Sequence, residues 1–200
     1  MKLFLTSTAA NVMNKIVPGL PKKPEDTSVL FIPTAGNVYE KTPWIDDDLN
    51  KLKVLGFRLK VLDIEHKTEQ EIRDAIHDID LVFVAGGNTF YLLEQMRKSG
   101  FDKLLCENID NIVYIGSSAG SVICGPDLKP VEIFDDRAKS NLKDTRGLNF
   151  IDCVVLPHFG KEKYGPYHKK VIKEYGDQFK IIPITDGQYI EVNNNGYELF

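Results

Sequence analysis

A serine between two glycines is the first residue in this sequence with the setting for covalent chemistry. Residues 116–120 read Gly-Ser-Ser-Ala-Gly and follow an apolar run at residues 111–115. In a Gly-x-Ser-x-Gly turn from strand to helix, the middle serine adopts a strained backbone with its hydroxyl projecting, and larger side chains at the glycine positions would collide. Ser118 is therefore the candidate nucleophile, and the Ala119 N–H at the helix start points to where an oxyanion would form. A plain packing turn or a phosphate cradle has the same pattern.

A second glycine turn occupies residues 86–90, which read Gly-Gly-Asn-Thr-Phe after the apolar run at residues 81–85. Free N–H groups on such a loop supply the other half of an oxyanion hole, and Gly87 is the candidate donor. We expect Asn88 and Thr89 in the same turn to contact substrate. Taken alone, the segment also fits an ordinary turn and helix cap.

A histidine stands at a third strand end, because residues 153–156 are apolar and lead into Pro-His-Phe-Gly. A serine nucleophile needs a base whose pKa lies near the working pH, and histidine is the usual choice. His158 is therefore the candidate base. The remaining histidines lie in a charged loop or on helices: His66, His77 and His168.

An orienting carboxylate would complete a triad by holding one tautomer of the imidazole. We favour Asp186, since it follows the apolar run at residues 180–184 and so lies at a fourth strand end. An ordinary Asp-Gly turn is the alternative reading of that residue. Three acids in the long stretch after Ser118 remain open as third members, although each needs a particular loop conformation: Glu132, Asp135 and Asp136.

These residues must be positioned by alternating strands and helices. Short runs rich in β-branched residues predict strands buried on both faces, and segments with helical spacing lie between them. This alternation predicts an α/β fold with a mostly parallel sheet and helices on both faces, in which ligands bind beyond the carboxyl ends of the strands. The predicted strands are residues 2–5, 29–32, 58–62, 81–85, 112–115, 153–156 and 180–184, and the predicted helices include 68–79, 89–98 and 167–175.

Two stretches interrupt the alternation. Residues 36–43 lead into Asp46, Asp47 and Asp48, which we interpret as the solvated first turn of a helix rather than a metal site. Residues 125–150 form a long charged stretch without period, and loops of that length are usually functional or mobile. Thr68 and Glu71 predict a capping box at a helix start.

The composition limits the class of protein. A chain of 200 residues with 42% hydrophobic and 27% charged residues predicts one domain spanning residues 1–200. A net charge of −4 argues against nucleic acid as a partner, and three cysteines without CxxC spacing argue against disulfides or structural zinc. No apolar run has the length of a secretory signal or a membrane span, so we expect a cytoplasmic protein without a membrane partner.

The motifs at residues 86–90, 116–121 and 157–159, in this order and in a chain of this length, resemble the peptidase E (alpha-aspartyl dipeptidase) family, whose wider relatives include cyanophycinase. The resemblance implies a class I glutamine amidotransferase-like α/β fold in which a serine replaces the usual cysteine. It also implies a serine peptidase without metal or cofactor, with Ser118 as nucleophile, His158 as base, and Gly87 and Ala119 as oxyanion donors. Asp186 matches the family's late acidic position before a glycine, and Glu132 matches the alternative loop position loosely.

One departure from the family concerns specificity. Dipeptidases that prefer an amino-terminal aspartate carry an arginine in the helix after the histidine, and our alignment places His168 there. We therefore expect His168 to contact substrate, with Lys169 and Lys170 nearby as point charges. Asp-X dipeptides should be cleaved poorly at neutral pH, and a preference for acidic substrates should grow towards pH ~6 as a histidine protonates.

The sequence thus predicts a serine hydrolase that cleaves small peptides through a Ser118 acyl-enzyme. The oligomeric state is left open, with a homodimer as one alternative. An esterase or amidase for a non-peptide acyl group is the nearest rival. A non-catalytic module that binds a small anion or nucleotide in the glycine turns is a rival from another class.

Overall fold

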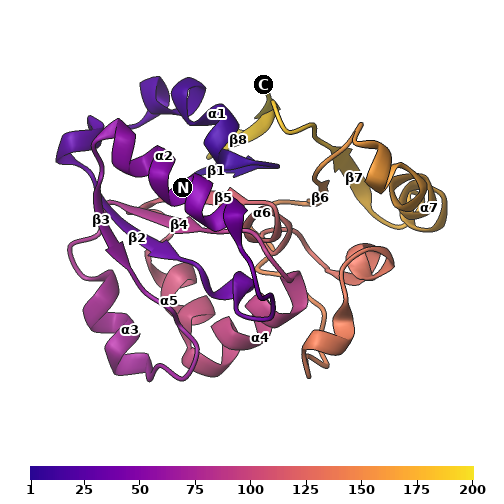
Figure 1. The fold of residues 1–200 in the computed structure, drawn as a ribbon, viewed down its shortest axis with the longest axis horizontal. Coiled ribbons are helices and arrows are strands. Elements are labelled where there is room, and N and C mark those ends of the chain that lie inside the picture. The colour runs from indigo at the N-terminus through magenta and orange to yellow at the C-terminus, as the bar shows by residue number, and fades with distance from the viewer.

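The computed structural model describes all 200 residues (Figure 1). Its strands are β1 (Lys2–Thr6), β2 (Ser28–Ile32), β3 (Arg58–Val61), β4 (Leu81–Val84), β5 (Val113–Ser117), β6 (Cys153–Leu156), β7 (Lys180–Pro183), β8 (Tyr189–Asn193) and β9 (Gly196–Leu199). Its α-helices are α1 (Ala9–Ile16), α2 (Pro43–Leu55), α3 (Glu69–Ile76), α4 (Thr89–Ser99), α5 (Phe101–Asn108), α6 (Ala119–Val122) and α7 (Gly165–Tyr175). Short 3₁₀ helices are η1 (Val17–Gly19), η2 (Pro24–Asp26), η3 (Thr34–Gly36), η4 (Lys129–Ile133), η5 (Arg137–Lys139) and η6 (Glu162–Tyr164).

Seven strands form the main sheet in the order β3-β2-β4-β5-β1-β8-β9. The first five pair in parallel, and β8 and β9 add an antiparallel edge beyond β1. Parallel neighbours place their carboxyl ends at one edge of the sheet, where ligands bind in folds of this kind. The fold class expected from the sequence is confirmed.

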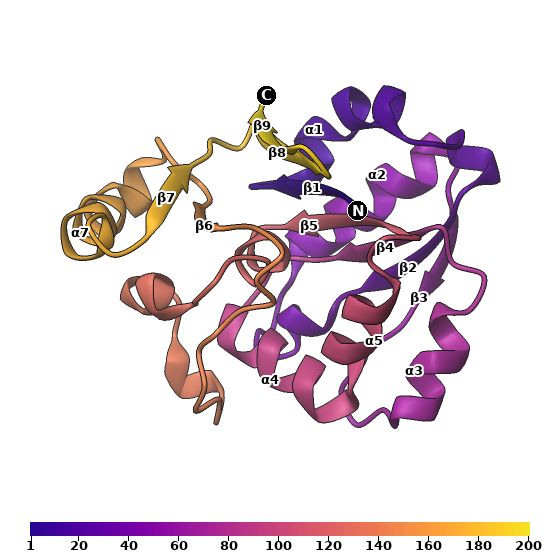
Figure 2. The ribbon, with the colours of Figure 1, turned by 180° about the vertical axis from the view of Figure 1, so that it is seen from behind.

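Helices cover both faces of this sheet, with α1 and α2 on one side and α3, α4 and α5 on the other (Figures 1 and 2). Alternate residues of a strand point to opposite faces, so β1 sends Phe4 into one core and Leu3 and Leu5 into the other. Burial on both faces explains why these strands are continuous apolar runs in the sequence.

A second, two-stranded sheet pairs β6 with β7 in parallel and lies beside the main sheet, next to α7 (Figures 1 and 2). His158 follows β6, and Asp186 follows β7 closely. The register places Leu156 opposite Pro183, so the two strands end side by side. The small sheet therefore brings two of the predicted site residues together.

All seven predicted strands are present, and the predicted helices correspond to α3, α4 and α7. The capping box at Thr68 and Glu71 is confirmed. Asp46 lies in the first turn of α2, as predicted, but Asp48, two residues further along the helix, is only 2% exposed. Strands β8 and β9 were not predicted.

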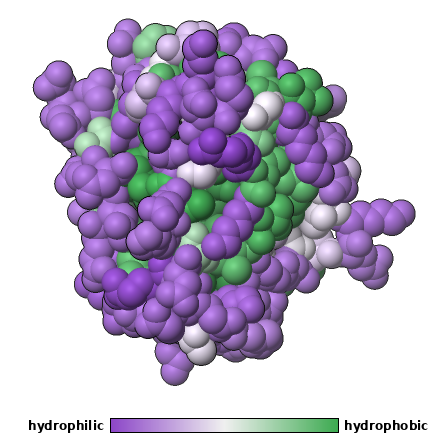
Figure 3. Space-filling view, turned by 90° about the vertical axis from the view of Figure 1, so that its left-hand side faces the viewer, coloured by the Kyte–Doolittle hydropathy of each residue, from purple (hydrophilic) through white to green (hydrophobic).

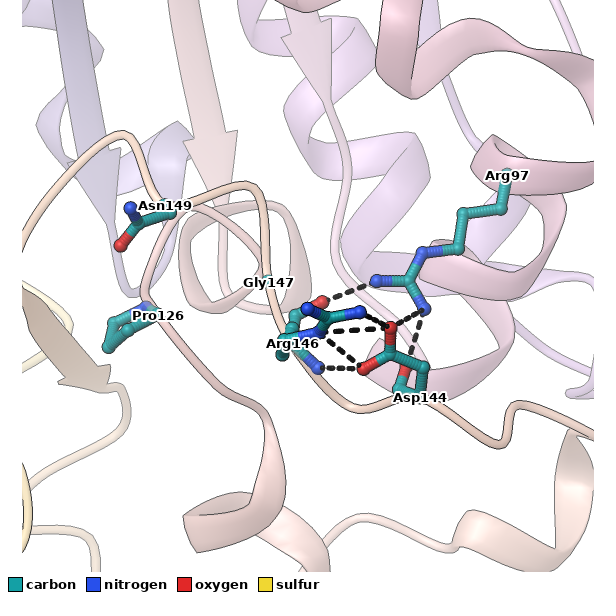
Figure 4. Close-up of a pocket in the computed structure, with 6 residues that line it drawn as sticks. All are labelled: Arg97, Pro126, Asp144, Arg146, Gly147 and Asn149. Atoms are coloured by element: carbon teal, nitrogen blue, oxygen red, sulfur yellow. Dashed lines mark hydrogen bonds and ion pairs between the residues drawn. The ribbon is translucent and has the colours of Figure 1, made fainter.

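The stretch at residues 125–150 is held against α4 (Figure 4). Arg97 donates to the carbonyl oxygens of Asp144 and Arg146, and Arg146 grips the Asp144 carboxylate with Nη2 at 2.6 Å. These residues line a cavity of about 440 Å³ with Gly147 and Asn149. The charged side chains that line this cavity thus bond to each other and to backbone carbonyls, and these bonds anchor residues 125–150 to α4.

The face of the molecule that carries the β3 edge shows apolar side chains bordered by polar ones (Figure 3). Val54 of α2 and Val61 of β3 are exposed, at 84% and 53%. No helix combines the length and apolar character needed to cross a membrane.

Candidate active site

The candidate nucleophile lies on a strained turn between β5 and α6. Ser118 has φ 49° and ψ −106°, outside the regions that non-glycine residues favour. Its N–H donates to the Thr6 carbonyl at 3.0 Å, and its carbonyl accepts from Ser121 and Val122. A Cβ on Gly116 would lie 2.5 Å from the Gly120 carbonyl oxygen, so only glycine fits at this position of the turn. The sequence thereby folds so that the hydroxyl projects from the strand end.

His158 faces this hydroxyl, with 3.0 Å between its Nε2 and Ser118 Oγ. Its backbone also has a positive φ, 60°, and the Tyr164 ring stacks on the imidazole at 5.2 Å between centroids. Burial lowers the pKa of His158, and Asp186 opposes that effect. A neutral imidazole is therefore favoured at pH 7, with a lone pair available to accept a proton.

Asp186 lies on the other side of the imidazole, with Oδ1 2.8 Å from His158 Nδ1. Its second oxygen forms an ion pair with Lys161. Burial would raise the pKa of Asp186, but hydrogen bonds from Lys161, Ser7 and His158 outweigh burial and hold the pKa well below its usual range. The ionised carboxylate favours the tautomer with the proton on Nδ1, which leaves Nε2 free towards Ser118.

Ser7 connects this pair to the main sheet. It follows β1 and is 1% exposed. Its hydroxyl donates to Asp186 Oδ1 at 2.6 Å and accepts from the His158 backbone N–H at 2.8 Å. The same oxygen lies 3.1 Å from His158 Nδ1. One side chain therefore fixes both the imidazole and the carboxylate.

Two backbone N–H groups are free to bind an oxyanion near Ser118. Neither the Gly87 N–H nor the Ala119 N–H donates a hydrogen bond within the chain. The Gly86–Gly87 turn lies against the nucleophile, because a Cβ on Gly86 would be 3.2 Å from the Ser118 Cβ. Free donors beside a nucleophile are what an oxyanion hole requires.

The candidate active site opens onto a cavity of about 1250 Å³. Ser7, Gly87, Ser118, His158 and Asp186 all line it. Its walls are aromatic and charged, including Tyr39, Trp44, Phe134, Tyr164, Tyr167, Lys139, Lys161 and Lys163. A cavity of this size accommodates a peptide around the serine. No group of three or more His, Cys, Asp or Glu side chains is arranged to hold a metal ion.

A buried acid lies behind the nucleophile turn. Asp48 Oδ1 accepts from the Ala10 N–H at 2.8 Å at the start of α1, while Oδ2 has no partner. Burial raises the pKa of Asp48 from 3.8 to about 6, although the nearby Ser117 and Ala10 groups favour the charged form. Ala9 N–H donates to the Ser117 hydroxyl at 3.2 Å. Two hydrogen bonds thus hold the start of α1, the helix that follows Ser7: one to Asp48 of α2 and one to Ser117 of the nucleophile turn.

The three residues expected to contact substrate do not line the cavity. Asn88 is fully buried and binds Asp135 and the Asp136 carbonyl through its amide, while its oxygen caps α4. Thr89 is 3% exposed, and its N–H donates to Asp135 at 2.7 Å. Both residues instead secure the 125–150 stretch to the second glycine turn.

His168 is 2% exposed, with Nε2 2.9 Å from the Pro157 carbonyl. Its ring lies among those of Phe134, Phe159 and Tyr164. Burial lowers its pKa, which disfavours a charged imidazole near pH 6. The expectation of a direct substrate contact by His168, with a pH-dependent preference for acids, does not fit this position.

The loop acids have other partners than His158. Glu132 forms an ion pair with Arg137, Asp135 accepts from Asn88 and Thr89, and Asp136 caps η5 through Ala138 N–H. Among the acids considered from the sequence, only Asp186 contacts the imidazole.

Comparison of the sequence with models of protein families shows that the model of peptidase family S51 matches residues 3–200. The chain belongs to peptidase family S51. The resemblance to the peptidase E family is thereby confirmed. Membership of this family supports peptidase activity for the chain.

Three relatives of this S51 chain carry peptidase names, and two of them match it over more than nine-tenths of their own length. An uncharacterized peptidase of Listeria monocytogenes is 34% identical over 190 residues, which cover 94% of this chain and 92% of the relative. One from Pasteurella multocida is 33% identical over 196 residues, covering 96% and 94%. Peptidase E of Salmonella typhi is 25% identical over 178 residues, covering 84% and 73%.

Solved structures agree on the fold. The crystal structure of a candidate peptidase E protein from Listeria monocytogenes EGD-e superposes with a TM-score of 0.93 at 31% identity, covering 100% of this chain and 97% of that one. A peptidase from an acI-B1 Actinobacterium shares the fold, with a TM-score of 0.70 at 19% identity.

Sequence reasoning missed Ser7, Lys161, Trp44 and Asp48. Ser7 was within reach of the rule that selected Ser118, because the polar residues Thr6, Ser7 and Thr8 directly follow the first predicted strand. Lys161 and Trp44 lie in loops or helix starts without such a signal. Asp48 belonged to an acidic run that resembles any solvated first turn.

Proposed function

We propose that this chain is a serine peptidase that cleaves small peptides through an acyl-enzyme on Ser118. The observation that carries the proposal is the chain of contacts from Ser118 Oγ to His158 Nε2 at 3.0 Å and from His158 Nδ1 to Asp186 at 2.8 Å. The strained backbone of Ser118 supports the same role, because such turns expose a nucleophile.

In this mechanism His158 accepts the Ser118 proton as the oxygen attacks the peptide carbonyl, and the Gly87 and Ala119 N–H groups stabilise the oxyanion. The imidazolium then protonates the leaving amine, and the C–N bond breaks to give the acyl-enzyme. His158 then deprotonates a water molecule as its oxygen attacks the ester carbonyl. The acyl C–O bond breaks, and the His158 imidazolium protonates the leaving Ser118 oxygen. Asp186 stays ionised and stabilises the imidazolium.

Strict aspartyl specificity is not part of this proposal. The cations that line the cavity are lysines, and one of them, Lys161, is engaged by Asp186. Lysine offers a carboxylate only a point charge, whereas an arginine fork offers matched geometry. We therefore expect Asp-X dipeptides to be poor substrates.

The test is hydrolysis of a dipeptide panel by the native chain and by Ser118→Ala. Removal of the nucleophile should lower turnover by several orders of magnitude while the unfolding midpoint stays within a few degrees. Unchanged hydrolysis by Ser118→Ala would exclude the proposed mechanism. Cleavage of acyl esters without any dipeptide would support the esterase alternative instead.

A further inference from the structure

The only tryptophan of the chain stands beside the glycine turn of the site. Trp44 is the second residue of α2, and its indole Nε1–H donates to the Gly86 carbonyl oxygen at 2.9 Å. Its ring meets Tyr39 edge to face at 5.6 Å and lines the cavity. We propose that Trp44 is a positioning residue that fixes the direction of the Gly87 N–H, an inference that rests on the proposed function.

The argument begins with the geometry of one peptide plane. The Gly86 carbonyl and the Gly87 N–H belong to the same trans peptide, so they point in opposite directions. A donor that holds the carbonyl on one side therefore aims the N–H to the other side. The contact with Trp44 thus controls a group that Trp44 does not touch.

The peptide plane between Gly86 and Gly87 has few other restraints on its orientation. Both flanking residues are glycines, so no Cβ restricts the rotation of the plane. Gly87 has φ 153°, and a Cβ there would overlap the Ala35 carbonyl, so a stiffer residue cannot replace it. The turn is otherwise anchored one residue later, where Asn88 N–H donates to Ala35 at 2.8 Å. Trp44 supplies the anchor on the other side.

The position of the plane connects this contact to the reaction. The turn lies beside Ser118, because a Cβ on Gly86 would be 3.2 Å from the Ser118 Cβ, and the Gly87 N–H has no acceptor within the chain. A donor aimed at the oxyanion acts mainly in the transition state, so a misdirected N–H lowers kcat and leaves KM nearly unchanged. A role of Trp44 in substrate binding alone would raise KM instead.

Because Trp44 is the sole tryptophan, its N–H can be removed without changing the ring shape. Growth of a tryptophan auxotroph with 3-benzothienylalanine places sulfur where the indole N–H is, and growth with 5-fluorotryptophan gives a matched control that keeps the N–H. We would measure the rate of Ser118 modification by a fluorophosphonate, together with kcat and KM for p-nitrophenyl acetate. Trp44→Phe, checked by its unfolding midpoint, provides a genetic version of the same deletion.

The expected result is a fall of about 10- to 100-fold in both kcat and the modification rate for the sulfur protein, with KM within about twofold. The fluorotryptophan protein should stay within about threefold of the native chain. Equal rates for the two substituted proteins would overturn the role of Trp44 and leave the proposed function standing. A native chain that fails to react at Ser118 would overturn the proposed function and this inference with it.

Discussion

The two sheets of the molecule contribute different parts of the candidate site. The main sheet provides the nucleophile, the glycine turn and Ser7 from the ends of β5, β4 and β1. The small β6–β7 sheet provides the proposed base and the proposed acid. The first group rests on a ladder of parallel strands buried on both faces, whereas β7 is largely half-buried and α7 buries only His168 and Val171.

The difference shows where the precision of the site comes from. No strand ladder joins the two sheets, so apolar packing of Cys153, Val155 and Ile184 into the main core and polar contacts between the sheets hold Ser118 and His158 in register. The hydroxyl of Ser7 makes two of these contacts, and Asn11 and Lys15 of α1 add bonds to the carbonyls of Asp186 and Gly187. Geometry across the two sheets is therefore expected to be more sensitive to single polar substitutions than geometry within either sheet.

The largest expected effect concerns the acid of the small sheet. Asp186→Asn keeps the shape but removes the charge that favours the Nδ1 proton, so kcat should fall by about 10²- to 10⁴-fold. Glu132→Gln, on the loop, should change kcat less than tenfold, since Glu132 pairs with Arg137. The two variants are compared by steady-state kinetics on the dipeptide that the native chain cleaves fastest. A larger loss from Glu132→Gln would assign the third position to the loop.

Ser7→Ala tests the connection between the sheets. Loss of the hydroxyl removes one donor from Asp186 and one acceptor from the His158 N–H, so kcat should fall by about 10- to 100-fold with little change in KM. Thr6→Val is the matched control, because it also deletes a buried hydroxyl, one that bonds to the Gly116 carbonyl and not to the small sheet. Similar kcat values for the two variants would contradict the account.

The pH profile measures the balance between burial and charge at His158. Burial lowers the pKa of His158, so kcat/KM should decline only below pH 6.5 as the imidazole protonates. Lys161 also lowers that pKa, and it neutralises Asp186. Lys161→Gln should therefore move the acid limb of the profile to higher pH. A limb that stays in place or moves down would show that Lys161 does not act on the imidazole.

The smallest effect on activity is expected at Asp48, where stability changes instead. In the folded state the Asp48 carboxyl has a pKa of about 6, whereas in the unfolded chain its pKa is near 3.8. Stability attributable to this group is therefore present at low pH and lost as pH rises from 4 through 6, about 3 kcal/mol in all at roughly 1.4 kcal/mol per pKa unit. Asp48→Asn should remove that slope and raise the free energy of unfolding at pH 8. Denaturant unfolding at pH 4.5 and pH 8 tests this, and an unchanged slope would contradict the assigned pKa.

The sequence was most informative where backbone and burial decide the structure. Continuous apolar runs predicted the seven strands, and the glycine spacing predicted the turn at Ser118, because close backbone approach there excludes side chains. The rule that chemistry lies at strand ends selected Ser118, His158 and Asp186, which the structure brings together.

Side-chain directions were harder to predict. His168 has helical spacing that fits either face of α7, and its burial depends on the nearby rings of Tyr164 and Phe159 and on Phe134 from the 125–150 stretch. Asn88 and Thr89 lie in the correct turn but point to the 125–150 stretch, which has no periodicity to place it. Strands β8 and β9 alternate polar and apolar residues at the sheet edge, so they lack the continuous apolar run of a central strand.

In the proposed mechanism, Ser118 of the main sheet is activated by His158 of the small sheet. Covalent labelling of Ser118 measures this activation without a peptide substrate. The native chain, His158→Ala and Ser118→Ala would be treated with a fluorophosphonate at pH 7.5, and the modified peptide identified by mass spectrometry. We expect one adduct, on Ser118, that forms at least about 100-fold more slowly in His158→Ala and is absent in Ser118→Ala. An adduct on another residue, or equal labelling rates with and without His158, would contradict the proposed mechanism.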